Sequence, residues 1–347
     1  MKIIIANTIV PFIDGGATFI ADWLELKMRE HGHQVEAVKI PFSSYYKDIL
    51  TQMLALRLYH LEDECERLIC LRMPSYMIPH PQKYLWFLHH YREVYDLWNS
   101  NTDSDYLPKN SESIAVKEYI MRADNVTFRE ARKIYTISKN VSNRLMTFNN
   151  IDSTPLYYPL LKPEQFFCES YGDYIYYTSR ICVPKRQFLA VEAMKYTKTK
   201  VKLLITGRPD TPDYMVKIRK YIMDNSLESK ITVSDKWITE EEKAKYFSNC
   251  LAALSIPYDE DGYGYVALEA FHSRKAVITC TDSGGVNELI VNGENGWCFE
   301  PDPKILAESF DRLYEDRQTA EKMGNLGIHR IDELGITWDN VIKAFTL

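Results

Sequence analysis

The sequence contains no apolar segment that approaches the ~18 consecutive residues required by a membrane-crossing helix. Residues 1–7 are predicted to form a strand and not a signal peptide, because their apolar run is short and no small-residue cleavage site follows it. We therefore expect a cytoplasmic protein. A location at the inner face of the cell membrane stays open as an alternative.

Patterns that bind metals or form disulfides are also scarce. The seven cysteines are odd in number, include no C-x-x-C pair and are scattered along the chain, as is typical of reduced thiols. Asp103 and Asp105 form a D-x-D pair, but they lie in a polar run that follows no predicted strand. A solvated loop is therefore favoured over a metal site. The sequence predicts no metal and no other cofactor.

Positive charge is not in excess. The chain has 42 Lys and Arg against 48 Asp and Glu, which gives a formal net charge of −6. General binding to nucleic acid is therefore not expected, because it requires a basic domain. Residues 126–144 are locally rich in Lys and Arg, which could face an anionic acceptor or give peripheral contact with a membrane. A solvated face is the default explanation of such a charge run.

What the chain does contain is a repeated alternation of strand and helix. Its 347 residues are too many for one compact core and predict two domains. The alternation predicts parallel sheets covered by helices on both faces. Strands are expected at 2–6, 35–40, 67–71, 84–88, 133–137, 174–178, 202–206, 231–233, 251–255 and 276–279. Helices are expected at 17–30, 44–61, 113–128, 140–148, 185–196, 213–223, 239–249, 264–272 and within 304–334.

The alternation is interrupted at residues 157–172, where two prolines occur and no clear periodicity remains. We place the interdomain linker there, so the domains are predicted to cover 1–160 and 161–337. The fold class is α/β, with two Rossmann-like, doubly wound domains that face a cleft. In such sheets ligands bind at the carboxyl ends of the strands.

Residues 257–290 are the most informative segment. Asp261 and Glu269 stand eight positions apart, with glycines between them where a loop enters a helix, and Gly284 and Gly285 open the next helix. Glycine-rich loops at helix N-termini present unpaired N–H groups to anions. Two such turns with carboxylates between them predict a nucleotide-sugar ligand. The plain alternative is ordinary turn chemistry and a solvated Glu.

A second motif, which contains basic residues, follows the strand expected at 174–178. Arg180 and Lys185 straddle a strand-to-helix turn and could converge on one anion. Basic side chains that merely solvate a helix start are a common alternative. However, positive charge at a helix N-terminus opposes the helix dipole, which favours an anion between them.

Two further turns end strands of the first half. Gly15 and Gly16 follow the first strand, but the third glycine of a dinucleotide-binding G-x-G-x-x-G is absent. His89 and His90 end the strand expected at 84–88, beside Arg92. A single His is more often structural, whereas two beside an Arg at a strand end indicate function.

In this order the motifs resemble those of the retaining GT-B glycosyltransferases of family 4, the glycosyl transferases group 1. The E-x7-E signature corresponds to 261–269, with Asp261 where the family usually has Glu. The G-G-x-x-E element corresponds to 284–288, and the R-x4-K clamp to 180–185. The resemblance implies the GT-B fold, in which residues 338–347 form a last helix that packs back on the first domain.

The resemblance also implies roles for the donor site. Arg180 and Lys185 would neutralise the diphosphate, Glu269 would accept hydrogen bonds from the ribose, and Asp261 would contact hydroxyls of the transferred sugar. Backbone N–H groups would hold sugar or phosphate oxygens at Ser283, Gly284 and Gly285.

Other positions follow from the same resemblance. Gly15 and Gly16 would approach the donor phosphate and the acceptor, and Gly207 would lie at the cleft rim. Trp237 lies where the family packs the nucleotide base, although a core role is an equal alternative. One histidine would lie near the transferred sugar, and the sequence does not decide between His89 and His90.

The function implied is that of a metal-independent, retaining hexosyltransferase. It would move a hexose from a nucleotide-diphosphate sugar to a glycan or lipid-linked saccharide, in surface polysaccharide or glycoconjugate biosynthesis. One alternative is a GT-B nucleotide-sugar epimerase or hydrolase. Another is a non-catalytic partner subunit of the same fold, which the unusual Asp261 invites.

Overall fold

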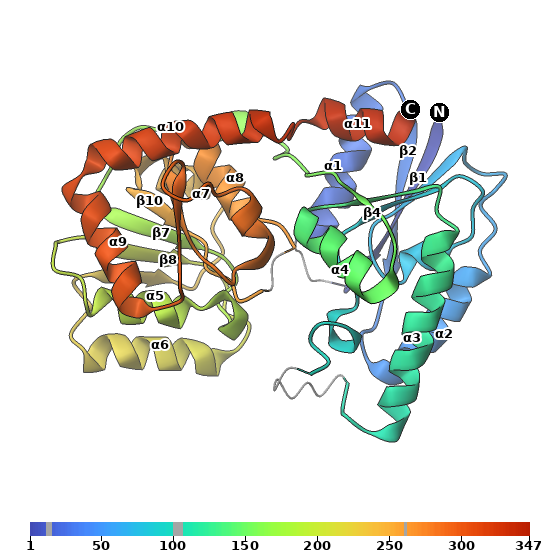
Figure 1. Cartoon of the computed structure of the whole chain (residues 1–347), viewed down its shortest axis with the longest axis horizontal. Helices are drawn as coiled ribbons and strands as arrows, with labels where there is room; N and C mark the ends of the chain where they lie inside the picture. Colours follow the sequence, from blue (N-terminus) through green and yellow to red (C-terminus); the bar gives the residue numbers. More distant parts are fainter. Residues whose placement is uncertain (12–15, 100–106, 260–261) are drawn as a thin grey trace. The chain divides into compact units, whose positions relative to one another are not determined.

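The chain divides into two compact units, drawn in Figure 1 from a computed structural model that describes residues 1–11, 16–99, 107–259 and 262–347. Unit 1 comprises Met1–Tyr158 and Thr337–Leu347, and unit 2 comprises Pro159–Ile336. The division falls two residues before the expected boundary at 160, and the return to unit 1 begins one residue before 338.

Within its described residues, unit 1 contains a six-stranded parallel sheet of order β2-β1-β3-β4-β5-β6. The strands are β1 (Lys2–Ile9), β2 (Gln34–Pro41), β3 (Arg67–Cys70), β4 (Lys83–Phe87), β5 (Lys133–Thr136) and β6 (Thr154–Pro155). The helices are α1 (Gly16–Glu30), α2 (Tyr46–Arg57), α3 (Ser111–Arg129), α4 (Lys139–Asn149) and α11 (Trp338–Thr346).

Unit 2 repeats the scheme, and its described residues form a six-stranded parallel sheet of order β12-β11-β10-β7-β8-β9. Its strands are β7 (Tyr174–Thr178), β8 (Lys202–Thr206), β9 (Ile231–Ser234), β10 (Ala252–Leu254), β11 (Ala276–Cys280) and β12 (Gly296–Phe299). Its helices are α5 (Gln187–Met194), α6 (Pro212–Asp224), α7 (Glu240–Asn249), α8 (Tyr265–His272), α9 (Pro303–Glu315) and α10 (Arg317–Glu333).

Helices cover both faces of the unit 2 sheet. α5 packs with α6 and α9 on one face, and α8 packs with α7 and α10 on the other (Figure 1). Every residue of β11 is buried, as expected for a strand covered on both sides. The predicted α/β fold with two parallel sheets is therefore confirmed.

Three local differences from the sequence-based expectations occur in unit 2. The helix expected from 185 begins at Gln187, because residues Val183–Lys185 form a 3-10 turn, η4, and Arg186 is left-handed with φ 58°. Gly284–Glu288 forms a short 3-10 helix, η5, in place of an α-helix. The edge strand β12 was not expected, since its four residues carry little periodicity.

The C-terminal helix α11 completes the core of unit 1. Phe345 is fully buried, and its ring centroid lies 5.6 Å from that of Trp86 and 5.2 Å from that of Tyr135. The Tyr135 hydroxyl donates a 3.0 Å hydrogen bond to the carbonyl of Ala344, and Arg67 donates to the carbonyl of Phe345. Successive residues of β4 point to opposite faces, so Trp86 meets α11 while Phe87 meets Phe128 of α3.

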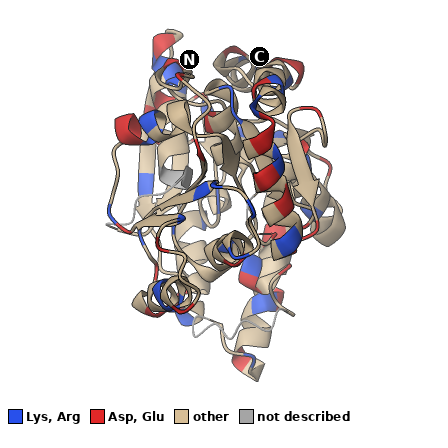
Figure 2. Cartoon of the chain, turned by 90° about the vertical axis from the view of Figure 1, so that its left-hand side faces the viewer, with Lys and Arg blue, Asp and Glu red and all other residues tan. Residues whose placement is uncertain are grey.

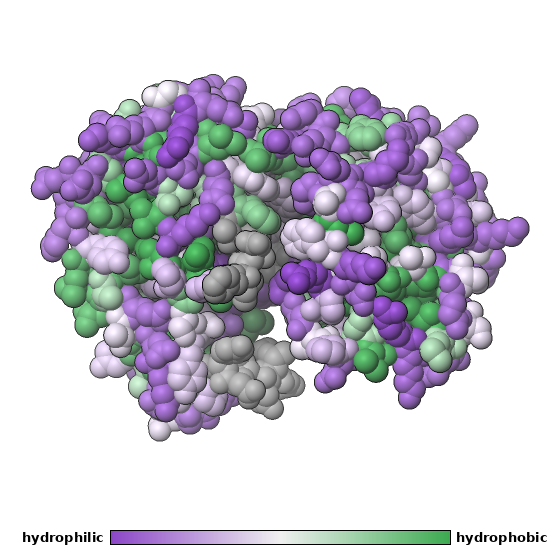
Figure 3. Space-filling model, turned by 180° about the vertical axis from the view of Figure 1, so that it is seen from behind, coloured by the Kyte–Doolittle hydropathy of each residue, from purple (hydrophilic) through white to green (hydrophobic). Residues whose placement is uncertain are grey.

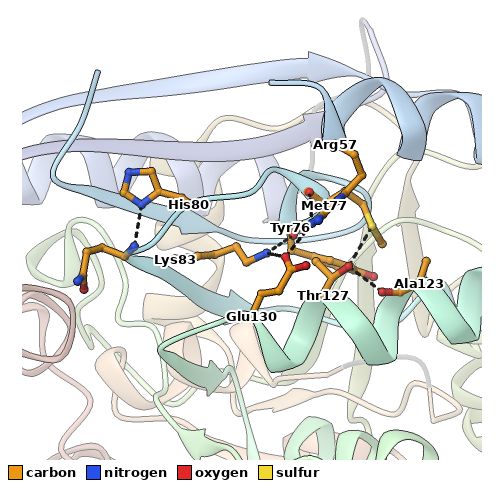
Figure 4. Close-up of polar contacts among 9 residues, drawn as sticks. Arg57, Tyr76, Met77, His80, Lys83, Ala123, Thr127 and Glu130 are labelled. Atoms are coloured by element: carbon orange, nitrogen blue, oxygen red, sulfur yellow. Dashed lines mark hydrogen bonds and ion pairs between the residues drawn. The ribbon is translucent and has the colours of Figure 1, made fainter. Parts of the chain in front are cut away.

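The opposite face of unit 1 is built around a buried cation. Lys83 has no exposed side-chain surface, and its Nζ lies 2.8 Å from Glu130 Oε2 and 3.1 Å from the carbonyl oxygen of Tyr76 (Figure 4). Arg57 of α2 donates to the same carboxylate at 2.7 Å. Burial opposes the charge of Glu130, but these hydrogen bonds hold its pKa below the usual value. The carboxylate thereby joins α2, β4 and α3.

Residues of both charge signs lie on the helices that face the viewer in Figure 2. Seen from behind, apolar residues reach the surface in groups among hydrophilic ones (Figure 3). Of the helices that the structure describes, none is both long and apolar enough to cross a membrane.

Replacing Phe345 with Ala should destabilise unit 1 by about 3–5 kcal/mol, because truncating a fully buried Phe leaves a cavity. Hydrogen exchange of the β4 amides measures this loss where it occurs. The control is Leu347→Ala, whose side chain is exposed and should leave β4 protection unchanged. Equal protection in both variants would contradict a stabilising role of α11.

Candidate functional site

The carboxyl ends of four neighbouring strands of unit 2 bring the predicted site residues to one edge of the sheet. β7 lies between β10 and β8, and β11 follows β10, with every pair parallel. The turns that follow these strands are joined by backbone hydrogen bonds. Tyr258 N donates to the carbonyl of Pro184 at 2.7 Å, and Asp259 N to that of Asp282 at 2.8 Å.

Two of the predicted glycines lie at close contacts between these turns. A Cβ on Gly207 would lie 1.7 Å from the carbonyl oxygen of Ser179, and the φ of Gly207 is 154°. A Cβ on Gly285 would lie 2.1 Å from the carbonyl oxygen of Gly262. Both positions therefore require glycine for backbone packing. This requirement holds whether or not a ligand approaches.

Arg180 follows β7 and extends into solvent. Its Nη1 lies 2.8 Å from Asp210 Oδ2, and the two side chains are 58% and 39% exposed. Exposed ion pairs of this kind contribute about 0–1 kcal/mol, so the guanidinium can exchange Asp210 for another anion at little cost.

Lys185 and Arg186 lie in and directly after η4. The backbone of Lys185 is held by the hydroxyl of Tyr177, which donates to its carbonyl, and its side chain is half-buried. Arg186 instead makes a bidentate contact with Asp282, at 2.9 Å and 2.5 Å. Its guanidinium also lies 4.8 Å from the ring centroid of Tyr258.

The Arg186–Asp282 pair was missed by the sequence analysis. Its partners are 96 residues apart, and no local pattern links them. The Arg186 side chain is only 14% exposed, so the pair is better shielded from water than Arg180 and Asp210. It fixes the turn that carries Lys185 against the turn that follows β11.

Glu269 lies on α8 and is directed into unit 2, with its side chain only 1% exposed. Burial raises the pKa of Glu269 to about 7, although Lys243 of α7 counteracts this with an ion pair at 2.5 Å. Among the described residues, Oε1 accepts no hydrogen bond of adequate geometry. A carboxylate oxygen can accept more than one donor, so it keeps capacity for a ligand hydroxyl.

Ser283 makes hydrogen bonds within the turn that follows β11. Its N–H donates to the carbonyl of Cys280 at 3.0 Å, and its Oγ accepts from Cys280 N at 3.2 Å. The side chain is fully buried. The Ser283 N–H donor is thus already used within the protein. Gly284 follows with φ 75°, a conformation that favours glycine.

The two candidate histidines, His89 and His90, occupy different environments. His90 is fully buried, with its ring against Phe87, Tyr95 and Phe148 and its Nε2 2.8 Å from Asn149 Oδ1. Burial lowers the pKa of His90 to about 4, so this ring is neutral at physiological pH. The sequence did not decide between His89 and His90, and the ring of His90 belongs to the core. His89 is exposed, with Nδ1 2.6 Å from the His90 carbonyl oxygen.

The structure also describes two other predicted residues, Trp237 and Gly16. Trp237 follows β9 and is 64% exposed, so it is not part of the core. Gly16 is the first residue of α1. The predicted residues Gly15 and Asp261 lie outside the described part of the chain, as do Asp103 and Asp105 of the disfavoured D-x-D pair.

The two units with their parallel sheets define the GT-B fold, which solved structures share over nearly the whole chain. Sucrose-phosphate synthase from Thermosynechococcus elongatus is 17% identical, with a TM-score of 0.78 and coverage of 98% of this chain and 96% of that one. HepE from Anabaena, solved with UDP and glucose, is 14% identical, with a TM-score of 0.73 and coverage of 100% and 99%.

Sequence comparison finds a family match over part of the chain. Residues 168–330 match the model of the glycosyl transferases group 1. The alpha-1,3/1,6-mannosyltransferase ALG2 of Dictyostelium discoideum is 27% identical over 128 residues, which are 37% of this chain. The match spans only 30% of that relative. The predicted resemblance to the glycosyl transferases group 1 is thus confirmed, on the segment that carries the site.

The contrast between the two arginine pairs gives a stability prediction. Asp282→Ala should lower the free energy of unfolding of unit 2 by about 1.5–3 kcal/mol, as expected for loss of hydrogen bonds between charged partners in a shielded position. Asp210→Ala is the matched control and should cost about 0–1 kcal/mol. Urea unfolding of both variants measures the difference. Equal losses would show that Arg186 does not fix the turn.

Proposed function

We propose that the chain is a retaining glycosyltransferase that moves a hexose from a nucleotide-diphosphate sugar to a saccharide or lipid-linked saccharide acceptor. The observation that carries this proposal is the turn after β7, where Arg180 and Lys185 lie at the carboxyl edge of a parallel sheet. Ligands bind at this edge in open α/β sheets. Two cations there suit the negative charge of a diphosphate.

The chemical role of these cations follows from the reaction. Negative charge grows on the diphosphate as its bond to the sugar breaks, and groups that stabilise this developing charge lower the barrier. Arg180 forms an exposed pair with Asp210, which it can exchange for a phosphate. Lys185 sits on a turn that Arg186 and Tyr177 hold in place. With retention, the leaving phosphate can take the acceptor proton on the same face.

The remaining roles concern the other parts of the donor. Glu269 would accept hydrogen bonds from the ribose, and Trp237 offers an exposed ring to the base. Asp261 would contact the transferred sugar, and the N–H groups of Gly284 and Gly285 its oxygens or the phosphates. His89 is the histidine we assign to the sugar. HepE binds UDP and glucose, which supports a nucleotide-sugar donor for this chain.

Replacing Lys185 with Ala should lower kcat by about 10²–10³, the effect typical of removing one group that stabilises developing charge. Sugar transfer from nucleotide-sugars to saccharide acceptors measures this loss. The control is Lys195→Ala, an exposed lysine just beyond the C-terminal end of α5, which should retain full turnover. Activity of Lys185→Ala within a few-fold of the unchanged protein would refute the clamp.

Nucleoside diphosphates should raise the melting temperature of the unchanged protein, because a ligand that binds only the folded state stabilises it. A panel of uridine, guanosine and adenosine diphosphates identifies the base. Release of nucleotide that is independent of any acceptor would favour an epimerase or hydrolase. Stabilisation without any turnover would favour a non-catalytic partner subunit.

Transfer should persist in excess EDTA, since we propose that Arg180 and Lys185 neutralise the diphosphate without a divalent cation. Turnover with and without the chelator measures this independence. Complete loss in EDTA that magnesium or manganese restores would refute a metal-independent reaction. It would also make Asp103 and Asp105 candidates for the metal site.

A further inference from the structure

A buried lysine on α7 lies against the carboxylate that we assign to the ribose. Lys243 lies one turn inside α7, whose start is fixed by a capping box between Thr239 and Glu242. Its side chain is 14% exposed, although lysines are rarely buried unless they are paired. The Nζ atom lies 2.5 Å from Glu269 Oε1 and 2.8 Å from Glu240 Oε1.

The two partners of Lys243 differ sharply in exposure. Glu240 is 61% exposed, so water already solvates its charge. Glu269 is enclosed, so most of the stabilisation of its negative charge must come from the protein. Burial opposes the charge of Lys243, yet Glu269 and Glu240 raise its pKa above the usual value. The lysine is therefore a stable cation beside a carboxyl that burial drives toward protonation.

Among the described charged groups that shift the pKa of Glu269, Lys243 is the only cation. From β7, Tyr176 approaches with a neutral hydroxyl that is bonded to Thr206 at 2.9 Å. On α8 itself, the ring of Tyr265 lies 5.9 Å from Lys243 Nζ. The charged groups of α10 and η3 (Pro163–Gln165), Asp332 and Glu164, act on His272 at the other end of α8.

We propose that Lys243 is a positioning residue that keeps Glu269 ionised and oriented, and thereby makes the site selective for ribose over deoxyribose. This inference rests on the proposed function, because it assumes a nucleotide at Glu269. A carboxylate accepts hydrogen bonds from both ribose hydroxyls, whereas a protonated carboxyl must use one oxygen as a donor. Each carboxylate oxygen can accept more than one hydrogen bond, so the contact of Lys243 with Oε1 leaves the carboxylate with accepting capacity.

The test compares each ribonucleoside diphosphate with its 2′-deoxy counterpart, using UDP with dUDP and GDP with dGDP. Calorimetry gives both dissociation constants at pH 7.5 and at pH 9. The unchanged protein should prefer the ribonucleotide by about tenfold at both values, as expected for one hydrogen bond to a charged acceptor. Lys243→Met should lose this preference at pH 7.5.

The dependence on pH separates this role from simple loss of packing. Without Lys243, the pKa of Glu269 rises further above its present value of about 7, because the ion pair that lowers it is gone. The variant should therefore regain ribose preference between pH 7.5 and pH 9, as Glu269 loses its proton. A Lys243→Met protein with the same preference and pH profile as the unchanged protein would overturn the proposal.

Matched variants keep the test decisive. Lys245→Met removes an exposed lysine of the same helix, paired with Glu169, and should behave as the unchanged protein. If Lys243→Met does not fold, Lys243→Met with Glu269→Gln replaces the pair by neutral groups and should lack ribose preference at both pH values. Retained preference in that double variant would also overturn the proposal. An unchanged protein that binds no nucleotide would instead refute the proposed function.

Discussion

The parallel pairing of β7 with β10 and β8 is the constraint on which the candidate site depends. It brings the turns after four strands to one edge of unit 2, although they are separated by up to about a hundred residues in the chain. The Arg186–Asp282 pair then joins the first of these turns to the last. Close backbone contacts at Gly207 and Gly285 leave no space for side chains between the turns. The site is thus held by backbone packing and one shielded ion pair.

Charges around this edge fall into two classes that differ in solvation. Arg180 forms an exposed ion pair with Asp210, which suits the proposed exchange of that partner for a phosphate. Glu269 and Lys243 are enclosed, so each controls the ionisation of the other. A ligand hydroxyl that reaches Glu269 on α8 would meet an acceptor whose charge depends on Lys243 of the preceding helix, α7. Solvation thus separates Arg180, which we propose binds phosphate, from Glu269, which we propose accepts hydrogen bonds from the ribose.

Much of the fold could be predicted from sequence, because β-branched strands and helical periodicity are local signals. The expected strands at 174–178 and 202–206 coincide with β7 and β8. The signals failed where structure depends on distant residues: the contact of Arg186 with Asp282, the burial of His90 and the pairing of Lys243 with Glu269. Glycine spacing located the turns, but it did not show that Gly207 and Gly285 serve backbone packing. Short edge strands such as β12 carry too few residues for a periodic signal.

The most direct measurement is hydrogen exchange of the full chain with and without a nucleoside diphosphate. Slower exchange is expected in the turn after β7, in η4, at Gly207, and in the segments around α8 and η5. All of these lie at or beside the carboxyl edge of the unit 2 sheet. Slowing confined to unit 1, or to β12 with α9 and α10, would contradict the claim that this edge binds the donor.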